Sequence, residues 1–201
     1  MIIDLGTGDG RAALALAQAE PTTLVIGIDA DAASMAETSR RAARAAARGG
    51  RPNLLFVAAA AESPPAELMG LADEVRILFP WGSLLRGVLG RDDRIVRGIT
   101  ALARPGAMVT ATISVTPADG VGNIRALDAA TIADLRRELI TFGLRLTGNR
   151  RLDREGVRAT RSTWGRRLLG AGADRPVWQL DFILEPRSTV LDGRPVGEPA
   201  V

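Results

Sequence analysis

The feature that most constrains this chain is a glycine-rich segment near its start, residues 4–10, with the sequence DLGTGDG. It follows a short apolar run and precedes an alanine- and leucine-rich stretch with helical periodicity, so its glycines lie where a strand is expected to turn into a helix. Asp29 ends the next apolar run, 19 residues after Gly10. Glycine allows a tight turn close to a ligand, and an acid at the end of the second strand accepts hydrogen bonds from ribose hydroxyls. The segment therefore predicts a nucleotide-type cofactor site on an α/β sheet.

The acid that opens this segment narrows the choice of cofactor. A carboxylate at Asp4 would repel a pyrophosphate, whereas it suits the methionine ammonium of S-adenosylmethionine (SAM). The spacing Gly-x-Gly-x-Gly also differs from the Gly-x-Gly-x-x-Gly typical of NAD-binding proteins. We therefore predict that Asp4, Gly6, Gly8 and Asp29 bind SAM. The structural alternative is that the acids only cap the first helix and the glycines only turn the chain, and for Asp9 a capping role stays open.

Apolar runs alternate with amphipathic stretches along most of the chain. Strands are expected at 2–5, 24–29, 54–58, 74–79, 107–115, 144–150 and 177–184, and helices at 10–19, 31–48, 65–71, 92–103 and 129–142. Such alternation predicts right-handed crossovers and a parallel sheet covered on both faces. The expected fold is a Rossmann-like α/β fold with a seven-stranded, mostly parallel sheet and an antiparallel last strand. It resembles the sheet of class I methyltransferases.

Length and composition bound the organisation and the chemistry. The chain of 201 residues fits one domain, expected at 1–185, and the Pro- and Gly-rich segment 186–201 is expected to be a flexible tail. The sequence lacks a run of 18 apolar residues and a signal peptide, so we expect a cytoplasmic protein without a membrane span. Because the chain contains no Cys and no His, disulfides, zinc sites and His-based general catalysis are excluded, and no metal is expected.

The distribution of charge points to a polyanionic partner. All 26 basic residues are Arg, and the net charge of the chain is +3. Residues 136–175 contain 11 Arg against four acids, which gives this part a net charge of +7 and leaves −4 for the remainder. A basic segment on an otherwise acidic chain is typical of proteins that bind nucleic acid.

The segment after the fourth expected strand, residues 79–90, has the sequence FPWGSLLRGVLG. Methyltransferases that act on amino groups of bases usually place a polar residue, two prolines and an aromatic residue here, to accept a proton from the amine. A ring nitrogen such as adenine N1 keeps a free lone pair at neutral pH, so its methylation needs alignment with the methyl group but no base. The Phe-Pro-Trp sequence therefore favours attack by a ring nitrogen.

Four motifs together resemble the aminoglycoside-resistance 16S rRNA (adenine 1408, N1) methyltransferases. They are DLGTGDG, the Ala-Glu pair at 61–62, FPWGSLLRGVLG and the STW sequence at 162–164. The similarity covers about 1–104 and returns at 162–168, and the Phe-Pro-Trp-Gly block is its most specific part. The resemblance implies SAM contacts at Asp4, Gly6 and Asp29, with Ala60, Glu62 and Leu78 around its adenine and Ser83 and Ser162 nearby. Taken alone, such a glutamate is more often a solvated loop acid or a cap for the helix expected at 65–71, but its position after the third strand, where such folds hold the adenine ring, favours the cofactor role equally.

The resemblance further implies that Trp81 and Trp164 sandwich the flipped target adenine, which replaces the stacking that the base loses on leaving its helix. A tryptophan is more often a core residue, and we expect Trp178, on the last strand, to be one. Trp81 and Trp164 differ because both fall in expected loops at the ligand-binding edge of the sheet.

Arginines form the expected docking surface for RNA. The predicted helix at 31–48 would place Arg40, Arg44 and Arg48 on one face, although cations near a helix C-terminus also complement its dipole. The resemblance implies that Arg40, Arg41, Arg44 and Arg167 contact rRNA phosphates. The family usually has a hairpin before the first strand, whereas Met1 directly precedes that strand here, and this departure bears on docking more than on chemistry.

The predicted activity is therefore SAM-dependent methylation of N1 of adenine 1408 in 16S rRNA of the 30S subunit. As the family implies, this gives resistance to kanamycin- and apramycin-type aminoglycosides. The enzyme is expected to be a monomer. Two alternatives stay open: a SAM-dependent methyltransferase of another RNA or of a small molecule, and a non-catalytic SAM- or RNA-binding paralogue.

Overall fold

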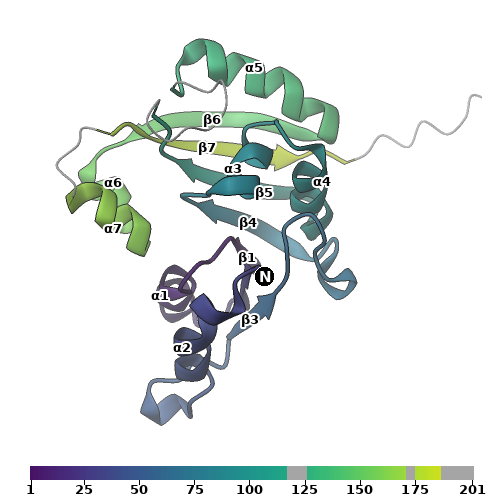
Figure 1. Cartoon of the computed structure of the whole chain (residues 1–201). Helices are drawn as coiled ribbons and strands as arrows, with labels where there is room; N and C mark the ends of the chain where they lie inside the picture. Colours follow the sequence, from purple (N-terminus) through teal and green to yellow (C-terminus); the bar gives the residue numbers. More distant parts are fainter. Residues whose placement is uncertain (117–125, 171–174, 187–201) are drawn as a thin grey trace, which may run out of the picture.

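The computed structural model describes residues 1–116, 126–170 and 175–186 (Figure 1). The predicted tail at 186–201 and the linker after Val115 therefore lie almost entirely outside the described residues. Within the described ranges, no helix is both long enough and apolar enough to cross a membrane.

Seven strands form a single sheet in the order β3-β2-β1-β4-β5-β7-β6. Their bounds are β1 Ile2–Leu5, β2 Val25–Asp29, β3 Leu54–Ala58, β4 Ala72–Leu78, β5 Ala103–Ile113, β6 Leu144–Leu152 and β7 Val177–Leu184. The pairs among β1 to β5 are parallel, and β7 is antiparallel to both β5 and β6. The predicted seven-stranded sheet with an antiparallel last strand is confirmed.

Seven α-helices flank the described part of the sheet. They are α1 Arg11–Ala19, α2 Ala32–Ala42, α3 Gly82–Val88, α4 Asp93–Leu102, α5 Ala129–Leu139, α6 Arg154–Ala159 and α7 Thr163–Gly170. Single 3-10 turns occur at Ala46–Arg48, Ala66–Leu68 and Ile140–Phe142. Four of the α-helices begin at an aspartate whose carboxylate accepts hydrogen bonds from backbone N–H groups of the first turn, namely Asp31, Asp92, Asp128 and Asp153. Such caps satisfy donors that a helix N-terminus otherwise leaves without partners.

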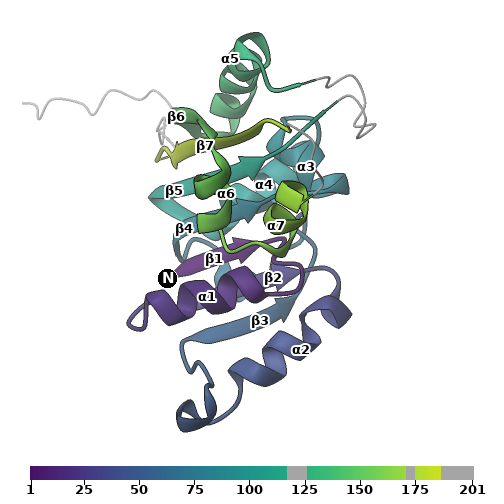
Figure 2. The ribbon, with the colours of Figure 1, turned by 90° about the vertical axis from the view of Figure 1, so that its left-hand side faces the viewer.

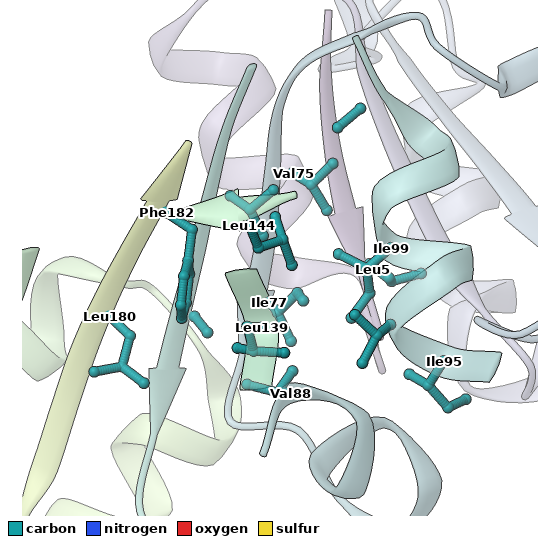
Figure 3. Packing of buried hydrophobic residues seen from close by; sticks show 14 of the residues in the cluster. Leu5, Val75, Ile77, Val88, Ile95, Ile99, Leu139, Leu144, Leu180 and Phe182 are labelled. Carbon is teal, nitrogen blue, oxygen red and sulfur yellow. The ribbon is translucent and has the colours of Figure 1, made fainter. Parts of the chain in front are cut away.

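The core is built on both faces of the sheet, as expected for parallel strands buried on both sides. On one face, Ile95 and Ile99 of α4 and Val88 of α3 pack with Leu5 and Ile77 of the strands (Figure 3). α5 joins the same cluster. A second cluster binds α1 and α2 to β2 and β3. In Figure 2, α1, α6 and α7 lie in front of the sheet, while α3 and α4 lie behind it.

The prediction of one helix over 31–48 is wrong, because α2 ends at Ala42. The returning chain terminates it: the Arg51 N–H donates to the Ala42 carbonyl at 2.8 Å. The backbone of Gly50 lies so close to the Arg44 carbonyl that a Cβ atom at Gly50 would lie 1.6 Å from that oxygen. The helix therefore stops because of this close approach between backbone segments.

Other elements differ from the prediction mainly where they are short. The expected helix at 65–71 is a single 3-10 turn, and α3, α6 and α7 were not predicted. β5 begins four residues before the expected 107, because Ala103 pairs with Ala72 ahead of a register shift in the β4–β5 ladder. A helix of six to eight residues has too few turns to produce a clear apolar period, so sequence periodicity misses it.

Candidate cofactor and substrate site

A cavity of about 570 Å³ opens at the carboxyl ends of β1, β2, β3 and β4. From β1 the chain proceeds outward to β2 and β3, whereas β4 pairs on the other side of β1. Open α/β sheets bind their ligands at such a switch point in strand order. The sheet topology alone therefore places a ligand site at this cavity.

Twelve of the residues predicted from sequence line this cavity. They are Asp4, Gly6, Gly8, Asp29, Ala60, Glu62, Leu78, Trp81, Ser83, Ser162, Trp164 and Arg167. They come from both halves of the chain, so the fold gathers the glycine loop, the β4–α3 connection and α7 around one space. Arg40, Arg41 and Arg44 do not line it.

The glycine loop needs backbone conformations that glycine adopts most easily. Gly8 has a φ of 57°, and a Cβ atom built on it would meet nothing within 4 Å, so its backbone faces open space. Gly10, at a φ of 71°, is the N-cap of α1, and a Cβ atom there would lie 2.5 Å from the Phe56 ring. Side chains at these positions would strain the loop, and at Gly10 they would also clash with the core.

Asp4 is a buried acid on β1 with an unsatisfied oxygen. Its side chain is 2% exposed, its Oδ2 accepts a hydrogen bond from Thr7 Oγ1 at 2.5 Å, and its Oδ1 has no hydrogen-bond partner. Burial raises the pKa of the Asp4 carboxyl to about 6, although the Thr7 hydroxyl and the positive charge of Arg76 act in the opposite direction. A buried carboxylate oxygen without a donor is costly, so the site suits a cationic donor such as a ligand ammonium.

Asp29 lies at the end of β2 and holds the glycine loop in place. Its Oδ2 accepts a hydrogen bond from Gly8 N at 2.8 Å, and its Oδ1 accepts one from Asp31 N at 2.9 Å. Each carboxylate oxygen has about two acceptor sites, so both oxygens keep the capacity to accept another hydrogen bond. The arrangement fits the paired hydroxyls of a ribose.

The rim of the cavity on the β3 side is the segment that contains Ala60 and Glu62. The backbone of Gly98 in α4 lies so close to it that a Cβ atom would lie 1.8 Å from the Ala61 carbonyl oxygen. Glu62 is exposed, and the 3-10 turn that follows has no side-chain cap. The capping role considered for Glu62 is therefore wrong, and its exposed side chain lies at the cavity, where both solvent and a ligand can reach it.

The segment from Phe79 to Trp81 leaves β4 with an unusual backbone. Phe79 has a φ of 50°, a value that residues other than glycine rarely adopt, and it is 5% exposed. The chain then becomes extended at Trp81, the N-cap of α3. Burial of the Phe79 ring thus directs Trp81 outward, where 45% of it is exposed.

The opposite wall is formed by α7. Ser162, 8% exposed, precedes the helix, and its Oγ accepts a hydrogen bond from Gly165 N at 3.4 Å. Gly165 packs against Phe79, since a Cβ atom there would lie 3.0 Å from the ring. Trp164 is the second residue of α7, so the prediction that it lies in a loop is wrong.

Trp81 and Trp164 face each other across the mouth of the cavity. Their ring centroids are 5.6 Å apart, and the ring planes are inclined by 39°. The Arg167 guanidinium lies over the Trp164 ring, 5.7 Å from its centroid, within the range of a cation–π contact. Trp178, by contrast, is half-buried on β7 and packs against the main core, as predicted.

The predicted basic face of α2 is only partly present. Because the helix ends at Ala42, Arg40 and Arg41 belong to it, whereas Arg44 and Arg48 follow it, and the expected common face of Arg40, Arg44 and Arg48 is wrong. All four side chains are exposed. Within the described residues, none of the four forms an ion pair or a side-chain hydrogen bond. Their guanidinium groups are therefore available for an anionic partner.

Sequence reasoning missed two contacts that organise this site. Asp9 precedes Gly10, the N-cap of α1, and its Oδ1 accepts a hydrogen bond from Arg11 N at 3.2 Å, which agrees with the capping alternative; its Oδ2 also accepts a hydrogen bond from Thr163 Oγ1 at 2.8 Å. Phe79 was identified as part of a motif, but its role as the packing surface for Gly165 was not predicted. Neither contact has a local signal, because both join segments that are far apart in the sequence. Within the described residues, no group of three or more acidic side chains is arranged to hold a metal ion.

The seven-stranded sheet, the glycine loop with the buried Asp4, and Asp29 at the end of β2 together define a class I SAM-dependent methyltransferase. The chain belongs to the family described as NpmA: 16S rRNA (adenine(1408)-N(1))-methyltransferase, whose family model matches residues 1–182. The resemblance inferred from the four motifs is thereby confirmed.

Relatives of this family are similar over most of the chain. A 16S rRNA (adenine(1408)-N(1))-methyltransferase from Streptoalloteichus hindustanus is 38% identical over 173 residues, which covers 84% of this chain and 80% of the relative. One from Escherichia coli is 37% identical over 174 residues, covering 83% and 79%.

Solved structures agree with the fold. A tryptophan-to-alanine variant of the enzyme from Catenulisporales acidiphilia, crystallised with the cosubstrate SAM, is 35% identical and superposes with a TM-score of 0.83 over 93% of this chain and 86% of that one. The 16S rRNA methyltransferase KamB is 34% identical, with a TM-score of 0.83 over 92% and 87%.

Proposed function

We propose that this protein transfers the methyl group of SAM to N1 of adenine 1408 in 16S rRNA of the 30S subunit, and that this gives resistance to kanamycin- and apramycin-type aminoglycosides. The observation that carries the proposal is the pair of exposed tryptophans, Trp81 and Trp164, at the mouth of a cavity that also contains the glycine loop. The names of the relatives support the same substrate. We further propose a single methyltransferase domain over 1–185 that acts as a monomer in the cytoplasm.

The residues at the inner end of the cavity fit SAM. The unsatisfied Oδ1 of Asp4 would accept a hydrogen bond from the methionine ammonium, and the open backbone of Gly8 leaves room beside it. Asp29 would accept the ribose hydroxyls. Gly6 would complete the turn. We assign the surroundings of the cofactor adenine to Ala60, Glu62, Leu78 and Ser83.

SAM supplies an electrophilic methyl group, and the task of the protein is to align adenine N1 with it. Trp81 and Trp164 would stack on the two faces of the flipped base, and each stack contributes roughly 1–3 kcal/mol. N1 carries a free in-plane lone pair at neutral pH, so no side chain has to remove a proton before attack. Ser162 lines the same cavity and would bind an edge of the base.

Exposed arginines outside the cavity would bind the ribosome. Arg40, Arg41 and Arg44 form no ion pairs within the described residues, and Arg167 lies beside the base platform. Arg side chains at phosphates position a protein on RNA without reading sequence.

Reversing the charge of Arg40 and Arg44 together is expected to weaken 30S binding by at least about tenfold, because two attractions become repulsions. The affinity for SAM should stay unchanged, since neither residue lines the cavity. A matched control reverses Arg94 and Arg97, which are exposed on α4 and lie outside the basic segment 136–175. Equal 30S affinity of the Arg40/Arg44 variant and the wild-type protein, measured by equilibrium binding, would argue against this docking surface.

The proposed function is tested by reverse transcription across the decoding site of 30S subunits treated with protein and SAM. A methyl group on N1 occupies the pairing edge of the base, so the polymerase is expected to stop at adenine 1408 only when SAM is present. Parallel reactions with labelled SAM on naked rRNA, tRNA and a small-molecule pool identify other substrates. Label that enters only one of these, or SAM binding without any turnover, would overturn the proposal.

A further inference from the structure

A single hydrogen bond joins the two halves of the site. Thr163 Oγ1 donates to Asp9 Oδ2 at 2.8 Å, and the two residues are 154 positions apart. Asp9 belongs to the glycine loop, and Thr163 is the first residue of α7, directly before Trp164. Both line the cavity. The bond therefore links the segment that would hold SAM to the segment that would stack on the target base.

Both ends of this bond are fixed by further contacts. Asp9 accepts a hydrogen bond from Arg11 N through Oδ1 at 3.2 Å, and its backbone carbonyl accepts one from Thr38 Oγ1 at 2.5 Å. The Thr163 hydroxyl also accepts a hydrogen bond from Arg166 Nη2 at 3.3 Å. Because that hydroxyl is both donor and acceptor, its orientation toward Asp9 is defined.

The tryptophan pair has no room for a base in this conformation. The ring centroids are 5.6 Å apart, whereas a sandwiched base requires about 7 Å, two van der Waals spacings of roughly 3.5 Å. The rings are also inclined by 39°, and two stacks on one flat base require them to be nearly parallel. Trp164 therefore has to move relative to Trp81 when the target adenine enters.

α7 has few ways to make this movement. Gly165 is packed against Phe79, on the segment that leads to Trp81, so a closer approach of the helix is blocked. Within the described residues, α7 is joined to the glycine loop by the hydrogen bond from Thr163 to Asp9. This bond therefore limits how far Trp164 can move away from Trp81 and how the two rings are oriented.

We propose that Asp9 and Thr163 are positioning residues for the methyl-transfer reaction. Their hydrogen bond keeps Trp164 in a fixed position relative to the glycine loop while the base enters. This inference rests on the proposed function. It assigns Asp9 a role in placing the target base, distinct from the role of Asp4 and Asp29 in holding the cofactor.

The test compares Thr163→Val, which removes the hydroxyl and keeps the branched shape, with Thr163→Ser, which keeps the hydroxyl. Single-turnover methylation of 30S subunits is expected to be about tenfold slower for Thr163→Val and close to the wild-type rate for Thr163→Ser. The dissociation constant for SAM should stay within about twofold. The matched control is Thr141→Val, because the Thr141 hydroxyl donates to the nearby Glu138 carbonyl at 2.7 Å and does not line the cavity.

A double-mutant cycle with Asp9→Ala separates this role from a general loss of structure. The double variant is expected to be no slower than the slower single variant, because both changes remove the same bond. Strictly additive losses, or a Thr163→Val enzyme as fast as the wild type, would overturn the inference.

A measurement without RNA keeps the inference separate from the proposed function. Acrylamide quenching of tryptophan fluorescence in the SAM-bound protein should be stronger in Thr163→Val than in the wild type and in Thr163→Ser, because Trp164 is held less firmly. Absence of a stop at adenine 1408 with wild-type protein would reject the proposed function. In that case the quenching result alone decides on the Asp9–Thr163 contact, and equal quenching in all three proteins would reject it.

Discussion

Replacing Trp164 by alanine is expected to lower kcat/KM for methylation of 30S subunits by between about 5- and 150-fold, while the affinity for SAM stays unchanged. The range corresponds to the loss of one base stack. Trp164 is 42% exposed and Trp81 is 45% exposed, so truncating either leaves no cavity in the core and should change thermal stability little. Trp164→Phe is expected to recover most of the activity, because an aromatic face remains.

Trp178→Phe is the matched control for this prediction. Trp178 packs against the main core, and its Nε1 is buried without a hydrogen-bond partner. The change to phenylalanine keeps the aromatic ring and removes the unsatisfied donor, so neither activity nor stability should fall. Single-turnover kinetics on 30S subunits and thermal unfolding of the three variants provide the measurements. An equal loss of activity in Trp178→Phe and Trp164→Ala would show that the base platform has been misassigned.

The cofactor half of the site could be predicted from sequence because its signals are local. A strand, a glycine turn and a helix follow one another within residues 1–19, and Asp29 ends the next strand along the chain. Parallel strands bring their carboxyl ends to one edge, so the convergence of these residues follows from the order of elements. Asp4, Gly8 and Asp29 therefore meet as expected.

The substrate half could be placed only through the resemblance to a family. No pattern in residues 153–170 shows that α6 and α7 lie over the glycine loop, since both helices are shorter than three turns. Their position depends on Phe79, which contacts a small cluster with Leu152, Val157 and Val177. The contact between Asp9 and Thr163 has the same origin, because it exists only after this cluster has formed.

Residues 31–48 show the opposite kind of error, in which tertiary structure overrides the local helix propensity. Residues 31–48 are rich in alanine and arginine, both strong helix formers. The helix nevertheless ends at Ala42. The backbone of Gly50 lies against the Arg44 carbonyl, and the Arg51 N–H donates a hydrogen bond to the Ala42 carbonyl. All four arginines are exposed, but Arg40, Arg44 and Arg48 do not share one face of a helix.

Asp4→Asn is expected to abolish measurable SAM binding at pH 7, because the substitution removes the only charge proposed to face the methionine ammonium. The same substitution should make the unliganded protein more stable. Burial raises the pKa of Asp4 to about 6, about two units above that of an unfolded aspartate, so ionisation of Asp4 at pH 7 costs the folded state about 3 kcal/mol. Loss of function together with a higher melting temperature distinguishes this acid from one that only supports the fold.

The raised pKa of Asp4 determines how folding stability and the affinity for SAM depend on pH. In the folded protein Asp4 is protonated below about pH 6, whereas in the unfolded chain it is protonated only below about pH 4. The stability cost is therefore complete above pH 6, declines as the pH falls from 6 to 4, and is absent below 4. The difference in unfolding free energy between Asp4→Asn and the wild type should shrink over this interval.

The affinity of the wild type for SAM should fall in the acid range, by up to about tenfold per pH unit below pH 6, because a protonated Asp4 no longer attracts the ammonium. Isothermal titration between pH 5 and 8 measures this slope. Asp134→Asn, on the exposed face of α5, is the matched control and should keep both the wild-type affinity and its pH dependence. If the wild type bound SAM equally well at pH 5 and pH 7, Asp4 would not be the partner of the ammonium. A buried acid whose ionisation weakens the unliganded fold would then need a different explanation at this position.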